Sequence, residues 1–158
     1  MPHPELKATL KKRLEGASKI AILGVGSEIR GDDAAGILAA RQLKNEPQLE
    51  VIIGGTTPEN LTGEIKKLNP SHLIIIDAAD MGEKAGTIKL IDPAEAGGYS
   101  FSTHSLPLKL MIDYLLAHFH CEIMIIGIQP ATIAFGSVPS PEILKSIQAV
   151  AAAISNVI

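Results

Sequence analysis

Short apolar runs alternate along the chain with stretches in which apolar residues recur every three or four positions. The runs predict strands at residues 19–25, 50–53, 72–78, 87–91 and 122–128. Continuous apolar runs of this length are typical of strands buried on both faces of a parallel sheet. The periodic stretches predict helices at residues 4–16, 33–43, 58–68, 105–118 and 141–157. The alternation predicts a single three-layer α/β domain over residues 1–158, a mostly parallel sheet of about five strands with helices on both faces.

The composition supports this architecture and excludes several classes of protein. The chain has 158 residues, 46% of them apolar and 20% charged, which is typical of one globular domain and not of a disordered segment or a coiled coil. Aromatic residues make up 3% and Trp is absent, so the chain is poorly equipped to recognise nucleic acids by base stacking. The net charge of −3 argues further against binding to a nucleic-acid backbone.

The sequence shows no feature of a secreted or membrane protein. Its first residues mix charges and lack the apolar stretch of a signal peptide, and its longest apolar runs are far too short to span a membrane. Cys121 is the single cysteine, which excludes an internal disulfide and a zinc site made of thiolates. We expect a cytoplasmic monomer that does not insert into membranes and keeps Cys121 as a buried free thiol.

Three polar stretches are placed to meet at one edge of the predicted sheet. They are residues 24–33, residues 77–82 and the segment 102–105, which contains His104. In open α/β sheets, ligands bind in the crevice beyond the carboxyl ends of the strands. These stretches are therefore the candidate positions of functional side chains.

The first polar stretch is rich in glycine but does not match a phosphate-binding loop. Ile29 stands where the dinucleotide-binding pattern requires a third glycine, and Asp32 and Asp33 stand where the Walker pattern requires lysine and serine or threonine. The two carboxylates supply negative charge at the start of the predicted helix and would repel a phosphate. Two interpretations remain open. Either one aspartate caps the helix while the other is a solvated first-turn acid, or a carboxylate is offered to a cation.

Asp77 and His104 are the candidates in the other two stretches. Asp77 ends an otherwise apolar strand, where an unpaired carboxylate is costly to bury, whereas Asp80 fits a loop acid or a cap. His104 precedes a predicted helix. Together, Asp33, Asp77 and His104 form a set of oxygen and nitrogen donors that suits a borderline divalent ion such as Ni²⁺ or Zn²⁺. Their spacing matches no local metal motif, so a metal site requires the fold to bring them together.

Around these residues the sequence resembles the [NiFe] hydrogenase maturation endopeptidases, and among them the type that serves hydrogenase 3. The segments that carry the resemblance cover most of the chain in the order of the family, at 22–36, 54–60, 73–93, 102–115 and 126–136. The resemblance implies an α/β domain with a twisted five-stranded sheet between helices. It also implies an endopeptidase that removes a C-terminal extension from the precursor of a [NiFe] hydrogenase large subunit after nickel insertion.

The resemblance further implies roles for the three candidate residues. The metal-binding positions of the family match Asp33, Asp77 and His104, which are therefore the expected catalytic and nickel-binding residues. The nickel is expected to arrive with the substrate precursor, and Zn²⁺ or Cd²⁺ are other ions that the site could hold. In this interpretation the nickel docks the scissile bond, and either the metal or an aspartate activates a water.

Two positions depart from the pattern of the family. Ile53 stands where the family usually has an aspartate linked to substrate handling, so either a neighbour such as Glu59 substitutes for it or this member does without it. Ser27 replaces the usual asparagine of the glycine loop, and both residue types can cap a turn. The departure at Ile53 keeps open a nickel-binding, chaperone-like protein without proteolytic activity. A nucleotide-binding α/β module is a further alternative.

Overall fold

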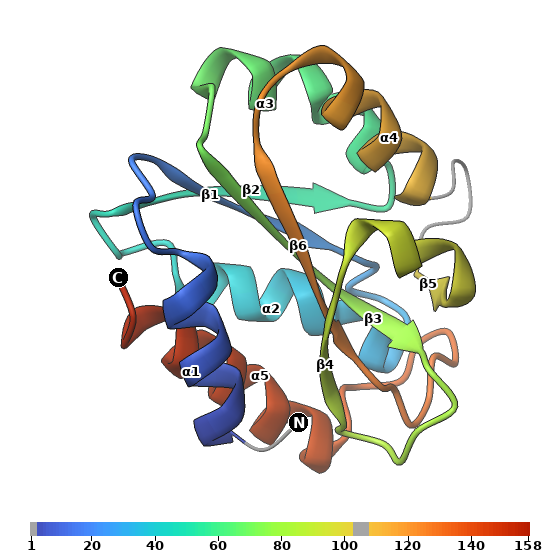
Figure 1. The fold of residues 1–158 in the computed structure, drawn as a ribbon. Coiled ribbons are helices and arrows are strands. Elements are labelled where there is room, and N and C mark those ends of the chain that lie inside the picture. Colours follow the sequence, from blue (N-terminus) through green and yellow to red (C-terminus); the bar gives the residue numbers. More distant parts are fainter. Residues whose placement is uncertain (1–2, 103–107) are drawn as a thin grey trace.

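The sheet of the domain lies between two layers of helices (Figure 1). The computed structural model describes residues 3–102 and 108–158. Within these residues, six strands form one sheet in the order β2-β1-β3-β6-β4, with β5 paired to β3. The strands are β1 (Ile20–Val25), β2 (Leu49–Gly55), β3 (His72–Asp80), β4 (Ile88–Ile91), β5 (Ser100–Phe101) and β6 (Glu122–Ile128).

The strands at the centre of the sheet are parallel, so their carboxyl ends share one edge. β1 pairs in parallel with β2 and β3, and β3 pairs in parallel with β6. β4 and β5 are antiparallel to their neighbours β6 and β3. The predicted mostly parallel sheet is therefore confirmed. The additional strand β5 is too short to leave a periodic signal in the sequence.

Two groups of helices cover the two faces of the sheet. Figure 1 shows α1 (His3–Arg13), α2 (Ala35–Gln42) and α5 (Pro141–Ser155) on one face, and α3 (Thr62–Leu68) and α4 (Leu108–His118) on the other. The side chains of β3 alternate between two buried clusters, with Ile74 packing among the residues of α2 and α5 and Ile75 among those of α3 and α4. Because both faces of β3 are buried, its residues form a continuous apolar run in the sequence.

Two predicted helices begin with a 3-10 turn. The helix expected at 33–43 starts as η1 (Gly31–Ala34) and continues as α2, and the helix expected at 58–68 starts as η2 (Pro58–Leu61) and continues as α3. A further 3-10 helix, η3 (Pro93–Gly98), leads into β5. The helix expected at 105–118 is described from Leu108 onward as α4, and its predicted start lies outside the described residues.

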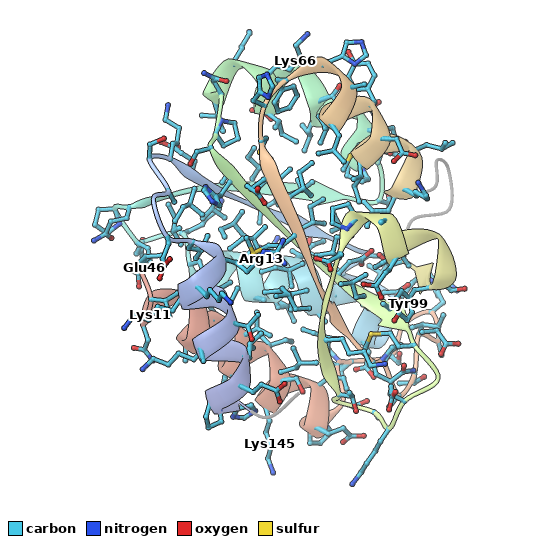
Figure 2. All side chains as sticks on the ribbon, in the orientation of Figure 1. Lys11, Arg13, Glu46, Lys66, Tyr99 and Lys145 are labelled. Carbon is cyan, nitrogen blue, oxygen red and sulfur yellow. The ribbon has the colours of Figure 1, made fainter. Side chains whose placement is uncertain are left out.

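Many charged side chains lie at the periphery of the domain, whereas Asp32, Asp33 and Asp77 are buried. Figure 2 shows Lys66 on α3 and Lys145 on α5 projecting away from the ribbon at opposite ends of the molecule. Along the described parts of the chain, no helix combines the length and the apolar character that crossing a membrane requires.

Candidate active site

The candidate site lies at the carboxyl ends of β1 and β3, where η1 meets the sheet. A Cβ atom at Gly36 would overlap the carbonyl oxygens of Val25 and Ile76, so glycine at this position lets α2 approach both strands closely. η1 directly precedes α2 and contacts β3. The close approach at Gly36 therefore brings the side chain of Asp33, in η1, toward that of Asp77, in β3.

The glycine loop after β1 wraps around the backbone of Asp33. The backbone N–H of Ser27 donates a hydrogen bond to the carbonyl oxygen of Asp33, with an N···O distance of 3.1 Å. Gly26 has a φ of +145°, and a Cβ atom there would overlap that same oxygen. The loop therefore needs glycine at position 26 to hold Asp33 in place, and Asp33 is only 3% exposed.

Asp77 is fully buried and receives hydrogen bonds from Ser102. The hydroxyl of Ser102 donates to Oδ1 of Asp77, and the backbone N–H of Ser102 donates to Oδ2 at 3.3 Å. Burial raises the pKa of the Asp77 carboxyl well above its usual range, and the nearby Asp33 carboxylate adds to the rise, while the Ser102 hydrogen bonds oppose it. Among the described residues, the Asp33 carboxylate is the only charge that perturbs this pKa. Two carboxyl groups therefore meet inside the protein, and no described lysine or arginine neutralises Asp77.

A small open pocket leads to these carboxyl groups. It has a volume of about 190 Å³, and its wall includes Asp33 and Ser102, the residue that hydrogen-bonds to the buried Asp77. Its other lining residues come from the end of β3, from β5 and from the loop after β6, and they include Asp80, Ser100, Phe101, Ser102, Pro130 and Ile133. A volume of this size accommodates a peptide group and a few waters, since one water occupies about 30 Å³.

The interpretation of the acidic pair Asp32 and Asp33 as a helix cap and a solvated acid is wrong. Neither side chain is solvated, and η1 has no side-chain cap hydrogen bond. Oδ2 of Asp32 accepts hydrogen bonds from the backbone N–H groups of Ala131 and Thr132 at 2.8 and 3.0 Å, and Oδ1 accepts one from the N–H of Ser140 at 2.7 Å. Asp32 therefore anchors the loop after β6, while Asp33 faces the pocket.

The segment after Asp77 differs from the sequence-based expectation. β3 continues to Asp80, because β5 pairs with Ala79 and Asp80 beyond the apolar run. Oδ1 of Asp80 accepts a hydrogen bond from the N–H of Gly82 at 3.2 Å, which is the local turn contact expected of a loop acid. Asp80 also lines the pocket, so a third carboxylate stands at its rim.

Sequence reasoning missed Gln129, which fixes the turn that carries Asp80. The side-chain oxygen of Gln129 accepts a hydrogen bond from the N–H of Met81 at 2.7 Å, and its amide nitrogen donates to Oδ1 of Asp80 at 3.3 Å. Gln129 is buried directly after β6. Its position after a buried apolar run, in the same place as Asp77 after its run, is the signal that could have found it.

His104 lies outside the described residues, so the structure does not place it relative to Asp33 and Asp77. Within residues 3–102 and 108–158, no three His, Cys, Asp or Glu side chains are grouped so that they could hold a metal ion. The role of the set of three as metal ligands therefore stays a prediction.

The two remaining sequence candidates lie elsewhere. Glu59 lines a separate groove of about 240 Å³ together with Thr62, Leu110 and Tyr114, and Ile53 packs half-buried against the core. Cys121 is half-buried instead of fully buried, and burial raises the pKa of its thiol to about 11. The Cys121 side chain is therefore a neutral thiol at pH 7 and a poor nucleophile.

Comparison with known proteins decides to which family this site belongs. The sequence model of the family HycI, hydrogenase maturation protease, matches residues 36–157. The chain belongs to the hydrogenase maturation protease family. It is 40% identical over 117 residues to the hydrogenase 3 maturation protease of Escherichia coli K12, a match that covers 72% of this chain and 74% of that protein.

Further relatives of this hydrogenase maturation protease cover most of both chains. A protein of Methanocaldococcus jannaschii, named as a putative hydrogenase maturation protease, is 39% identical over 140 residues, which are 82% of this chain and 83% of that protein. The crystal structure of the [NiFe] hydrogenase maturation protease HycI from Thermococcus kodakarensis has a TM-score of 0.86 at 31% identity, covering 94% of this chain and 97% of that one. The expected family and fold are thus confirmed, and the protein is a hydrolase of the endopeptidase type.

Proposed function

We propose that this protease removes the C-terminal extension from the precursor of a [NiFe] hydrogenase large subunit, and that nickel in the precursor is the element it recognises. The observation that carries the proposal is the juxtaposition of Asp33, which lines an open pocket, with the fully buried Asp77. The maturation proteases to which the chain is related are named for their action on hydrogenases. A buried acidic pair is a suitable receptor for a metal ion that such a substrate carries.

The electrostatics of the pair favour an incoming cation. Two carboxylates that lie close together inside a protein repel each other and lose hydration, so without a cation they hold on to a proton. The raised pKa of Asp77 follows from these two causes. A divalent ion at the pocket would displace that proton and relieve the repulsion. His104 would complete the ligand set with a nitrogen donor, as the resemblance to the family implies.

The two aspartates have different roles in this proposal. Asp77 is buried and fixed by hydrogen bonds from Ser102, a pocket-lining residue, which suits a stationary charge that holds the metal. Asp33 lines the pocket itself and can reach a water beside a bound peptide. Hydrolysis requires that the water lose a proton as its oxygen attacks the scissile carbonyl carbon, and that the leaving nitrogen gain one as the C–N bond breaks. Either Asp33 as a general base or the substrate nickel as a Lewis acid would assist the first transfer.

A cleavage assay with the nickel-loaded large-subunit precursor tests the proposal. We expect Asp33→Asn, Asp77→Asn and His104→Ala each to lower the cleavage rate by a factor of about 100 or more, because each removes a donor to the metal or the water. Asp113→Asn is the matched control, since Asp113 is an exposed aspartate that pairs with Lys109 on α4. Wild-type rates in all three site variants would refute the assignment. Binding of the precursor by the wild-type protein without any cleavage would instead favour the chaperone-like alternative.

A further inference from the structure

Two loops at the site are joined by hydrogen bonds into one unit. They are residues 26–31, which follow β1, and residues 129–140, which connect β6 to α5; we call them the paired loops. The N–H of Gly31 donates to the carbonyl oxygen of Ser137 at 3.1 Å, and the N–H of Gly136 donates to that of Ile29 at 2.7 Å. Gly31 has a φ of +57°, and a Cβ atom there would overlap the Ser137 side chain. The glycine is therefore required for the loops to meet.

Asp32, which lies in η1 next to Asp33, holds the second of the paired loops through its carboxylate. Besides the backbone N–H groups of Ala131, Thr132 and Ser140, its carboxylate accepts a hydrogen bond from the Ser140 hydroxyl at 2.9 Å. Hydrogen bonds to a buried carboxylate are stronger than those between neutral groups. The next residue along the chain is Asp33, so the same 3-10 turn that supplies the pocket carboxylate also holds the second loop.

The paired loops present large apolar side chains to solvent. Half of the exposed large apolar residues among the described residues lie on them, and four side chains form what we call the apolar rim. The rim consists of Ile29, Ile133, Phe135 and Val138, which are 59, 42, 73 and 79% exposed. Side chains of this size at such exposure are a cost in water unless a partner covers them. In Figure 1 the second loop, drawn in orange-red, lies beside the carboxyl end of β3.

The apolar rim is continuous with the pocket, and the second loop, which carries most of the rim, is uncharged. Ile133 belongs both to the rim and to the wall of the pocket that contains Asp33. Residues 130–140 contain no ionisable side chain. Pro130 and Pro139 restrict the backbone at the two ends of this segment. The second loop is therefore complementary to an uncharged, apolar stretch of polypeptide that enters the pocket.

We propose that the apolar rim is the docking surface for apolar residues of the precursor next to the scissile bond, and that Asp32 is the positioning residue that holds this surface in place. The inference rests on the proposed function, because it takes the precursor as the occupant. A loop held in one conformation before the substrate arrives loses little conformational entropy on binding. The paired loops thus supply affinity for the peptide, while the carboxylates and His104 act at the metal and the water.

The double substitution Phe135→Ser with Val138→Ser tests the docking surface. We expect the KM for the nickel-loaded precursor to rise about tenfold or more with little change in kcat, because two apolar anchors are lost and the pocket is unchanged. We expect the nickel-free precursor to bind without turnover, and the affinity for it should fall by a similar factor. Leu116→Ser is the matched control, since Leu116 is 46% exposed on α4, which covers the opposite face of the sheet from α5.

The outcomes separate this inference from the proposed function. If the wild-type protein cleaves the precursor and the double variant has the same KM and affinity, the docking surface is refuted and the function stands. If the wild-type protein binds the precursor but does not cleave it, and the double variant loses binding, the function is refuted and the docking surface stands. An equal loss of affinity in Leu116→Ser would also overturn the docking surface.

Asp32→Asn tests the positioning role. The amide of asparagine has an NH2 group, which would face one or more of the backbone N–H groups that donate hydrogen bonds to Asp32. We therefore expect the second loop to become less ordered. The KM should rise as in the rim variant, and kcat should change less. Ser140→Ala removes only the hydroxyl donor and keeps the backbone hydrogen bond, so it should have a small effect. Amide hydrogen exchange of residues 130–140 should increase in Asp32→Asn. A drop in kcat with unchanged KM and unchanged exchange would refute the positioning role.

Discussion

Replacing Asp77 by asparagine should stabilise the metal-free protein while it abolishes cleavage. Asp77 is fully buried, and burial together with the Asp33 carboxylate raises its pKa. The unfolded chain has an ordinary carboxyl at this position and releases its proton at a lower pH than the folded protein does. Between those two pKa values the folded state binds more protons than the unfolded state, so the free energy of unfolding of the wild-type protein falls as the pH rises. The amide of the Asp77→Asn variant does not titrate, so the variant would escape this loss.

The size of the effect follows from the same linkage. Below about pH 4 the carboxyl is protonated in both states, so the variant gains nothing. Above that pH the advantage of Asp77→Asn should grow by at most about 1.4 kcal/mol per pH unit, until the pH passes the folded-state pKa. Hydrogen bonds from Ser102 stabilise the charged form and reduce the gain. We expect a net advantage of about 1–3 kcal/mol at pH 7, which for a chain of this length is roughly 3–10 °C in Tm.

Thermal and urea unfolding of chelator-treated protein between pH 4 and pH 8 would measure this difference. Asp113→Asn is the control, because its exposed ion pair with Lys109 should contribute at most about 0.3–0.5 kcal/mol. The reasoning is refuted if the difference between Asp77→Asn and the wild type stays constant with pH, or if the wild type is the more stable protein at pH 7.

Further predictions concern the metal, the packing of α2 and the Ser102 hydrogen bond. Ni²⁺ should raise the Tm of the wild-type protein in a thermal shift assay and leave that of Asp33→Asn unchanged; equal shifts would contradict the proposed ligand. Gly36→Ala should lower the free energy of unfolding, measured in urea, by about 3 kcal/mol or more, because its Cβ would meet backbone oxygens. Gly63→Ala is the control: it has open space around it in α3 and should be neutral or stabilising by up to about 1 kcal/mol. Ser102→Ala should destabilise the protein by about 1–2 kcal/mol at pH 7 and raise the pKa of Asp77 further, since it removes a hydrogen bond to the charged form; an unchanged Tm at pH 7 would argue against that bond.

The fold was predictable where burial alone determines the pattern. The run that forms β3 packs on both faces, so its apolar residues follow one another without interruption and predict the strand. β5 was not predictable, because two residues carry no period and its pairing with Ala79 and Asp80 depends on the chain returning from η3. For the same reason, the extension of β3 past its apolar run to Asp80 is visible only in the folded structure.

The candidate site was likewise predictable from the sequence only in part. Asp77 ends an apolar run and Asp33 follows the glycine loop after β1, so residue type and place in the sheet made both of them candidates. That their carboxyl groups approach each other is visible only in the folded structure. The role of Asp32 was misjudged because the hydrogen-bond partners of its carboxylate lie about a hundred positions further along the sequence, where local rules for helix caps give no information. Its neighbour Asp33 has the same local sequence environment, and only the tertiary fold directs one carboxylate to a loop and the other to the pocket.

The central claim is that the buried acidic pair acts on nickel carried by the precursor. The most direct measurement is the cleavage rate of the same large-subunit precursor with and without nickel, in chelator-treated buffer, with the released C-terminal peptide identified by mass spectrometry. We predict release of the extension from the nickel-loaded precursor and none above background from the nickel-free one. Equal rates on both forms would contradict the claim.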